Sequence, residues 1–195
     1  MHRGAIFLDR DGTINTEVEY LSKPEQIELI PRSADAIREA RDLGFKIVIV
    51  TNQSGIARGF LTEAQLSDVH AELTSRLLSQ NARIDGIYYC PHHPSIGAGP
   101  YRKDCDCRKP KPGLIVRAAR ELDIDLTRSF SIGDRMSDVL AGKNAGLTSL
   151  LVRTGYGTQE LASLPPGTPQ IDHVADDLYD AIQYVKGIIL IPDRA

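Results

Sequence analysis

Acidic, hydroxyl and basic residues occur in four short groups along this chain, in an order that suits phosphoryl transfer. The groups are Asp9-Arg10-Asp11-Gly12-Thr13, Thr51-Asn52, Lys109, and Gly133-Asp134-Arg135-Met136-Ser137-Asp138. Two carboxylates two residues apart can share a magnesium ion while one of them attacks phosphorus. A hydroxyl can hold a phosphate oxygen, an ammonium can neutralise a phosphoryl group, and a further acid can complete the metal site.

Each group also has a plain structural explanation when it stands alone. An Asp-x-Asp-Gly run often forms a β-turn, and an Asp after a Gly often caps a helix. Threonine is common at strand ends, and a single lysine is usually a solvated surface residue. The order of all four groups along one chain is what favours chemistry.

The three cysteines form a second pattern, which predicts structural zinc. The first part is Cys90-Pro91-His92-His93, and the second is Cys105-Asp106-Cys107. Twelve residues, His93 to Asp104, separate His92 from Cys105. The Cys-x-Cys spacing seldom accommodates a disulfide, and an odd count leaves one thiol unpaired. Three thiolates and one imidazole make a closed tetrahedral set, so the zinc should hold a loop, about residues 90–110, rather than react. His92 matches the one-residue spacing of the other pair, although His93 could replace it, and a chance cluster of buried thiols is the alternative.

These groups need a scaffold, and the intervening sequence predicts one. Short runs that are continuously apolar favour strands buried on both faces, as in a parallel sheet. Such runs are Gly4 to Leu8, Lys46 to Val50, Ser129 to Ile132 and Thr148 to Val152, with Gly86 to Cys90 as a further candidate. Apolar residues at three- and four-residue spacing predict helices at Ser33 to Leu43, Thr62 to Leu78, Leu114 to Leu122, Ser137 to Ala145 and Ala175 to Val185. This alternation predicts an α/β fold with a doubly wound, Rossmann-like, mostly parallel sheet whose strands carry the chemistry at their carboxyl ends.

Length and composition narrow the class of protein. The chain has 195 residues, 42% of them hydrophobic and 25% charged, with a net charge of −3, which fits one folded domain over residues 1–195. No apolar run approaches the ~20 residues of a membrane span, and Gly4 to Leu8 is too short for a signal peptide. The mildly acidic balance disfavours nucleic-acid binding. We expect a cytoplasmic monomer without membrane partners, and a surface loop at the three prolines between Leu164 and Pro169.

Taken together, the four groups resemble the motifs of the haloacid dehalogenase (HAD) superfamily of aspartate-nucleophile phosphatases. The resemblance covers roughly residues 4–155, and no connection has room for an inserted cap domain. With the cysteine loop, the chain is similar to the D-glycero-D-manno-heptose 1,7-bisphosphate 7-phosphatase family, which acts in heptose assembly for lipopolysaccharide or surface glycans. The stretches that carry this similarity are Phe7 to Asn15, Val50 to Gly59 and Ile87 to Pro94.

The resemblance implies roles for individual residues. Asp9 would be the nucleophile, and Asp11 would protonate the leaving sugar oxygen and then activate water. The magnesium ligands would be the Asp9 side chain, the Asp11 backbone carbonyl and Asp134, whereas zinc would be bound by Cys90, His92, Cys105 and Cys107. Thr51 and Lys109 would steady the transferring group, and Arg108 would recognise a phosphorylated sugar. The sugar site would be lined by Glu17, Val18, Glu19, Tyr20, Asn52, Gln53 and Ser54.

Three other functions compete with this one. Histidinol-phosphate phosphatases share the same plan, but their zinc loop is typically shorter, so the twelve-residue gap favours the heptose branch. A zinc-stabilised binding protein with an inactive core should lack a catalytic position, and none is lost here. A nucleic-acid end phosphatase should show a basic stripe, which the net charge of −3 disfavours. The chain departs from its relatives at Arg135, where a lysine is common.

Overall fold

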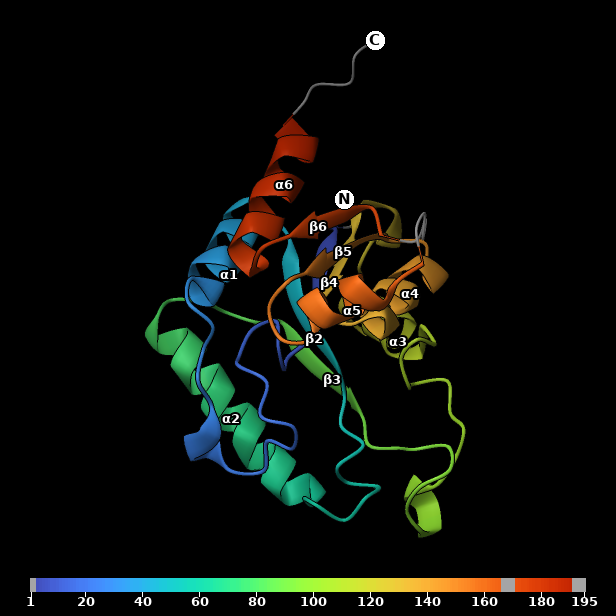
Figure 1. The fold of residues 1–195 in the computed structure, drawn as a ribbon. Coiled ribbons are helices and arrows are strands. Elements are labelled where there is room, and N and C mark those ends of the chain that lie inside the picture. The colour runs from blue at the N-terminus through green and yellow to red at the C-terminus, as the bar shows by residue number, and fades with distance from the viewer. Residues whose placement is uncertain (1–2, 166–170, 191–195) are drawn as a thin grey trace.

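The computed structural model describes residues 3–165 and 171–190, and their strands form one parallel sheet (Figure 1). The strands are β1 (Ala5–Leu8), β2 (Lys46–Asn52), β3 (Gly86–Cys90), β4 (Phe130–Gly133), β5 (Thr148–Val152) and β6 (His173–Ala175). Their order in the sheet is β3-β2-β1-β4-β5-β6, and each neighbouring pair is parallel. This confirms the predicted α/β class.

Helices connect the strands and cover both faces of the sheet. They are α1 (Ser33–Asp42), α2 (Glu63–Ser79), α3 (Gly113–Leu122), α4 (Met136–Asn144), α5 (Gly157–Ser163) and α6 (Leu178–Leu190), with 3₁₀ turns at Pro24–Gln26, Gly99–Tyr101 and Leu126–Arg128. None of these helices is long and apolar enough to span a bilayer.

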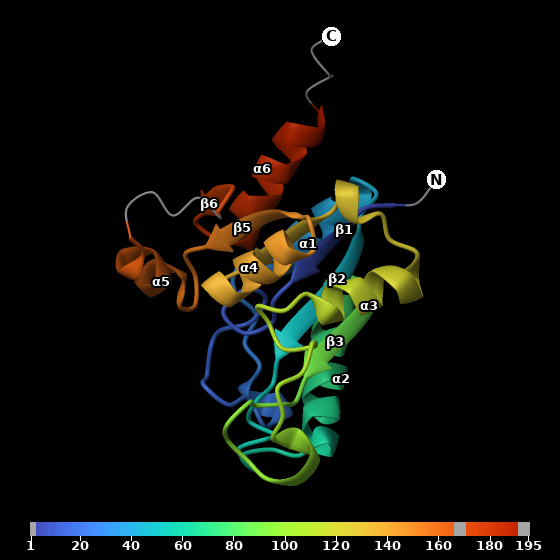
Figure 2. The same ribbon diagram turned by 90° about the vertical axis from the view of Figure 1, so that its right-hand side faces the viewer.

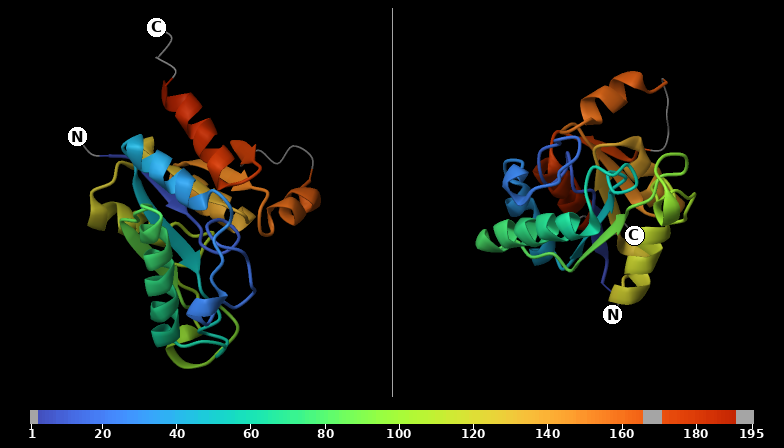
Figure 3. Two further views of the ribbon diagram at one scale, coloured as in Figure 1. Left: turned by 90° about the vertical axis from the view of Figure 1, so that its left-hand side faces the viewer. Right: turned by 90° about the horizontal axis from the view of Figure 1, so that it is seen from below.

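Alternate residues of the central strand pack into two separate cores. In β1, Ile6 and Leu8 join the apolar side chains of α1, α2 and α6, whereas Ala5 and Phe7 join those of α3 and α4. Successive side chains of a strand point to opposite faces, so a strand buried on both faces must be apolar throughout. Figure 2 and the left view of Figure 3 show the two helical layers from opposite sides.

The topology places β1 between β2 and β4, at the point where the order of the strands reverses. From β1 the chain continues to β2 and β3 on one side and returns as β4 on the other. Ligands of open α/β sheets bind where the strand order reverses in this way. Figure 2 shows the loops after β1 (blue), β2 (teal) and β3 (yellow-green) gathered at this end of the molecule.

The elements that sequence analysis missed are short or lie near the end of the chain. β6 has three residues and α5 has seven, too few for a periodic pattern. The helix predicted from Ala175 begins at Leu178 instead, because Ala175 pairs with Val152 in the sheet. Of the loop predicted at Leu164 to Pro169, residues 166–169 lie outside the described part of the chain.

Candidate active site

Three carboxylates meet at the carboxyl end of the sheet. Asp9 follows β1, Asp134 follows β4, and Asp138 lies in the first turn of α4. One oxygen of each lies within 4.8 Å of the others. Burial raises the pKa of Asp9 to about 6, because desolvation and the neighbouring Asp138 and Asp11 outweigh the attraction of Lys109. Such a cluster needs cations nearby.

Lys109 supplies one cation from the loop before α3. Its ammonium donates to Asp9 Oδ1 and to the Val50 carbonyl, each at 2.7 Å, and lies 2.7 Å from Asp138 Oδ1. Its side chain is 4% exposed. Burial opposes the charge, but the carboxylates of Asp138 and Asp9 raise the pKa of Lys109 above its usual value. The lysine therefore stays an ammonium beside Asp9.

Asn52 holds Lys109 in this place. Its Oδ1 accepts from the Lys109 N–H at 3.1 Å, and its Nδ2 donates to the Lys109 carbonyl at 3.1 Å. This pair of bonds clamps the loop before α3 to the end of β2. Asn52 thus has a structural contact in addition to the sugar contact predicted for it.

The donor set beside Asp9 fits a magnesium ion. Asp134 Oδ1 is buried and has no hydrogen-bond partner among the described residues, whereas Oδ2 accepts from the Tyr156 N–H at 2.8 Å. Burial, with Asp9 and Asp138 adding to it, raises the pKa of Asp134 to about 8. A buried carboxylate oxygen without a partner is costly unless it binds a proton or a cation. Magnesium favours carboxylate oxygens of this kind.

Two glycines allow the backbone to approach Asp134 closely. Gly12 has φ +78° and Gly155 has φ +54°. A Cβ at either position would collide with Asp134 Oδ2. Glycine is therefore required at Gly12 both for the left-handed backbone and for the space beside the carboxylate.

Asp138 is one of the site residues that sequence analysis did not single out. Its Oδ1 pairs with Lys109, and its Oδ2 accepts from the Arg135 N–H at 3.0 Å. Both oxygens are thus engaged, unlike those of Asp134, so Asp138 serves first as the partner of Lys109. Its place in the fourth group, four residues after Asp134, was a signal that could have found it.

Asp11 points to a different set of partners. Its carboxylate accepts from Arg10 Nε at 3.0 Å and Arg10 Nη2 at 2.7 Å, from Asn15 Nδ2 at 3.0 Å, and from Gln53 Nε2 at 3.0 Å. Burial opposes ionisation, but the Arg10 guanidinium and these hydrogen bonds hold the pKa of Asp11 below its usual value. Gln53 also donates to Thr51 Oγ1 at 2.9 Å, so one amide links the ends of β1 and β2.

A pocket of about 350 Å³ opens above Asp9 and Lys109. Predicted site residues that line it are Glu17, Glu19, Tyr20, Asn52, Gln53, Ser54 and Arg108. Val18 does not line it, and this residue is 37% exposed. Sequence analysis did not predict Arg135 and Tyr156 there; the Arg135 guanidinium lies 3.7 Å from the centre of the Tyr156 ring.

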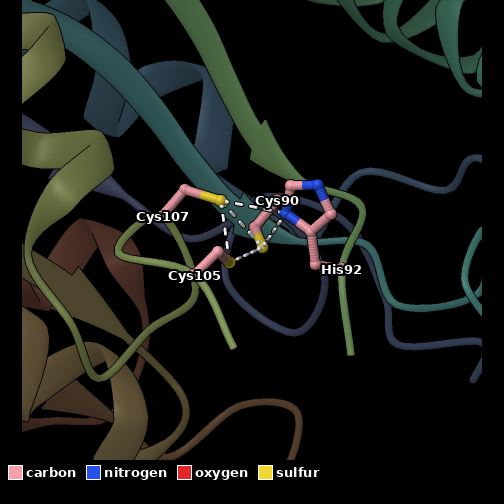
Figure 4. Close-up of side chains that lie close together, drawn as sticks. All are labelled: Cys90, His92, Cys105 and Cys107. Carbon is pink, nitrogen blue, oxygen red and sulfur yellow. Dashed lines mark hydrogen bonds between the residues drawn. The ribbon is translucent and has the colours of Figure 1, made fainter. Parts of the chain in front are cut away.

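Cys90, His92, Cys105 and Cys107 converge in the loop after β3 (Figure 4). Their sulfur–sulfur distances are 3.1–3.5 Å, and His92 Nδ1 lies 3.2 Å from Cys107 Sγ and 3.7 Å from Cys90 Sγ. Burial raises the pKa of the Cys90 thiol, which a bound cation would offset. His93 lies outside the cluster, and its Nδ1 accepts from the Ser95 and Ile96 N–H groups. The donor set suits structural zinc.

The cysteine cluster also positions Arg108. Arg108 follows Cys107 directly, and its Nη1 donates to the His92 carbonyl at 3.1 Å. Its side chain lines the pocket, together with Lys109. Asp104, a possible surface partner for this arginine, pairs with Lys111 at 2.7 Å instead.

Comparisons with known proteins agree with this geometry. The HAD-hydrolase-like family model matches residues 106–181. The chain is 42% identical over 185 residues to the D-glycero-beta-D-manno-heptose-1,7-bisphosphate 7-phosphatase of Pasteurella multocida, covering 94% of this chain and 97% of that protein. It is 44% identical over 187 residues to the enzyme of the same name from Escherichia coli K12, with 93% of each chain covered. The chain belongs to the D-glycero-D-manno-heptose-1,7-bisphosphate 7-phosphatase family.

Solved structures support the same assignment. The D,D-heptose 1,7-bisphosphate phosphatase of B. bronchiseptica, solved with magnesium and phosphate, is 34% identical and aligns with a TM-score of 0.82 over 95% of this chain and 99% of that one. The family, the HAD core and the phosphatase class predicted from the motifs are thereby confirmed.

Proposed function

We propose that this enzyme hydrolyses the 7-phosphate of D-glycero-D-manno-heptose 1,7-bisphosphate, in heptose precursor biosynthesis for lipopolysaccharide or surface glycans. The observation that carries the proposal is the Asp9–Lys109 pair at the floor of a pocket that Arg108 also lines. The relatives from Pasteurella multocida and Escherichia coli support the substrate, and the names of these two specify the β anomer. We propose the β anomer for this enzyme too.

Asp9 attacks the phosphorus of the 7-phosphate. A bond forms between an Asp9 oxygen and phosphorus, the bond from phosphorus to the sugar oxygen breaks, and its electron pair goes to that oxygen. Lys109 contacts Asp9 Oδ1 and can also face the phosphoryl oxygens, where its charge offsets theirs. The Thr51 hydroxyl, near the end of β2, would hold a phosphoryl oxygen.

Asp11 moves the protons of both half-reactions. Arg10 and the hydrogen-bond donors favour the carboxylate in the free enzyme, so Asp11 must take up a proton once the substrate is bound. It gives that proton to the departing sugar oxygen, and as a carboxylate it then takes one from the water that attacks the aspartyl phosphate. That attack breaks the bond between phosphorus and Asp9 and releases inorganic phosphate. Gln53 connects Asp11 to Thr51, so the proton-transfer group and the phosphate-binding hydroxyl share one support.

Two metals complete the proposed enzyme. Asp9, the Asp11 backbone carbonyl and Asp134 would hold Mg²⁺, which screens the charge between the Asp9 carboxylate and the phosphate. Cys90, His92, Cys105 and Cys107 would hold Zn²⁺, which would stabilise the loop that presents Arg108 and Lys109. Cysteines that stay reduced, as zinc binding requires, are typical of cytoplasmic proteins, so we propose a cytoplasmic enzyme.

We also propose that the enzyme is a monomer, since residues of one chain, around one sheet, form the whole site.

Substrate selectivity should arise from the rim of the pocket. A bisphosphate needs a cation away from the Asp9 site for its second phosphate, and Arg108 and Arg135 both line the pocket. A guanidinium can bind a phosphate through two parallel hydrogen bonds. Arg135 stacks on Tyr156, which limits its motion.

Steady-state kinetics with four substrates tests the assignment. They are the β and α anomers of the heptose bisphosphate, histidinol phosphate and fructose 1,6-bisphosphate. We expect the highest kcat/KM with the β anomer. A higher value with histidinol phosphate would support the competing phosphatase, and no turnover of any of the four would favour the binding protein.

A further inference from the structure

The partners of Asp11 form a chain that reaches into helix α2. Arg10 is fully buried, and its guanidinium contacts both oxygens of Asp11 through Nε and Nη2. The remaining terminal nitrogen, Nη1, lies 3.1 Å from His70 Nε2. His70 stands in α2, sixty residues further along the chain. One guanidinium thus joins a site carboxylate to a histidine outside the pocket.

The direction of the hydrogen bond between Arg10 and His70 follows from chemistry. Arginine has only donors, so His70 Nε2 must accept, and the imidazole must be neutral with its hydrogen on Nδ1. Burial and the nearby Arg10 charge lower the pKa of His70 to about 3, in agreement with a neutral ring. The ring is also held from β3, where Tyr89 packs against it edge-on at 5.8 Å between centroids.

The orientation of the Arg10 guanidinium decides the orientation of Asp11. Its Nε and Nη2 lie in one plane and hold both carboxylate oxygens, so a rotation of the guanidinium would turn Asp11 with it. Nη1 is the atom that could resist such a rotation, and His70 is the acceptor that fixes it. The side chains of Asn15 and Gln53 add one donor to each oxygen, but in the bonds described they contact neither the Arg10 guanidinium nor His70; Asn15 bonds only the Arg10 carbonyl, through its backbone N–H.

We propose that Arg10 and His70 are positioning residues for Asp11, with His70 fixing the Arg10 guanidinium and Arg10 fixing the carboxylate. This inference rests on the proposed function, in which Asp11 donates and then accepts a proton. After Asp11 has given its proton to the sugar oxygen, it is left as a carboxylate. The Arg10 guanidinium stabilises this negative charge, because it donates to both carboxylate oxygens. His70 itself contacts neither substrate nor the reacting atoms.

The leaving group of the substrate separates this role from a general loss of structure. Formation of the aspartyl phosphate from a sugar phosphate requires a proton on the departing oxygen, whereas p-nitrophenolate is a stable anion that leaves without one. The ratio kcat/KM reports the steps up to this first release. A misplaced Asp11 should therefore lower kcat/KM for the sugar bisphosphate much more than for p-nitrophenyl phosphate.

Three variants test the proposal. His70→Leu removes the acceptor, His70→Gln keeps one, and Thr74→Val removes the hydroxyl that bonds the His70 carbonyl one turn further along α2. For His70→Leu we expect kcat/KM with the heptose bisphosphate to fall about ten- to a hundredfold, with KM little changed. This is a part of the roughly 10²–10⁴-fold rate increase that acid–base catalysis typically supplies. The value for p-nitrophenyl phosphate should stay within about twofold, and His70→Gln and Thr74→Val should resemble the wild type on both substrates.

Other outcomes would overturn the proposal. These are equal losses of kcat/KM on both substrates in His70→Leu, no loss on either substrate, or a His70→Gln variant as impaired as His70→Leu.

If His70→Leu does not fold, Arg10→Lys replaces it, since a lysine cannot hold both Asp11 oxygens and His70 together. The same substrate-selective loss of kcat/KM is expected for Arg10→Lys. A wild-type enzyme inactive on heptose bisphosphate would defeat the proposed function alone. A series of aryl phosphates with progressively poorer leaving groups would still test the positioning role, through a steeper dependence on the leaving group in His70→Leu.

Discussion

The ammonium of Lys109 lies 2.7 Å from Asp9 Oδ1, although a hundred residues separate the two in the chain. The same ammonium lies 2.7 Å from Asp138, so one buried cation holds the end of β1, the start of α4 and the loop before α3 together. The proposed catalytic role of Lys109 and the stability of the fold are therefore coupled at this residue. A substitution here should affect both.

Lys109→Met should destabilise the fold as well as abolish turnover. It leaves two buried carboxylates without their cation, which typically costs about 3–5 kcal/mol in the free energy of unfolding. Lys111→Met is the matched control, since its solvent-exposed pair with Asp104 should contribute little to the free energy of unfolding. Denaturant unfolding of both variants checks this. A Lys109→Met variant as stable as the control would contradict the buried-cation role.

Asp9→Asn should abolish turnover while the fold stays intact, because an amide cannot form the acyl phosphate. Asp11→Asn should lose roughly two or more orders of magnitude in kcat, since acid–base assistance is typically worth 10²–10⁴. Steady-state rates with circular dichroism of each variant provide the measurement. An Asp9→Asn enzyme with a near wild-type rate would end the aspartyl-phosphate mechanism.

Arg108→Ala should impair the bisphosphate selectively. Charge-assisted contacts are worth about 1.5–3 kcal/mol, so kcat/KM for the heptose bisphosphate should fall roughly ten- to a hundredfold. Hydrolysis of p-nitrophenyl phosphate should change little, and Arg102→Ala, at an exposed arginine of the same loop, is the control. Equal losses on both substrates would place Arg108 at the transferring phosphate instead.

The two proposed metals should separate under chelation. Brief EDTA treatment should stop catalysis reversibly by removing Mg²⁺, while zinc bound to thiolates remains in elemental analysis. Cys105→Ser with Cys107→Ser should instead lower the melting temperature, since structural zinc contributes folding energy. Purified protein without zinc would refute the zinc site.

His70 should make the fold sensitive to mild acid. Its pKa is lowered to about 3 in the fold, from a usual value near 6.5, so between these values only the unfolded chain binds the proton. The free energy of unfolding should therefore decrease as pH falls from about 6.5 toward 3, by up to about 1.4 kcal/mol per pH unit. His70→Gln should show a weaker decrease over that range in denaturant titrations. Identical pH dependence in both proteins would contradict a neutral buried His70.

The sequence by itself determined the parts of this protein that depend on local patterns. Continuous apolar runs predicted β1, β2, β4 and β5, because a strand buried on both faces has no room for polar residues. The polar groups after those runs predicted the site, because parallel strands bring their carboxyl ends to one edge of the sheet. The cysteine spacing predicted a cluster that the structure assembles.

Only the tertiary structure decided which charges meet. The pairing of Lys109 with Asp138, the clamp of Asn52 on Lys109, and the contact of Arg10 with His70 join residues between 29 and 60 positions apart. Each depends on how helices and loops pack around the sheet, and no local spacing encodes that packing. Asp11 shows the same result: sequence placed it beside Asp9 in the motif, but packing brought Gln53, 42 residues further along the chain, into contact with its carboxylate.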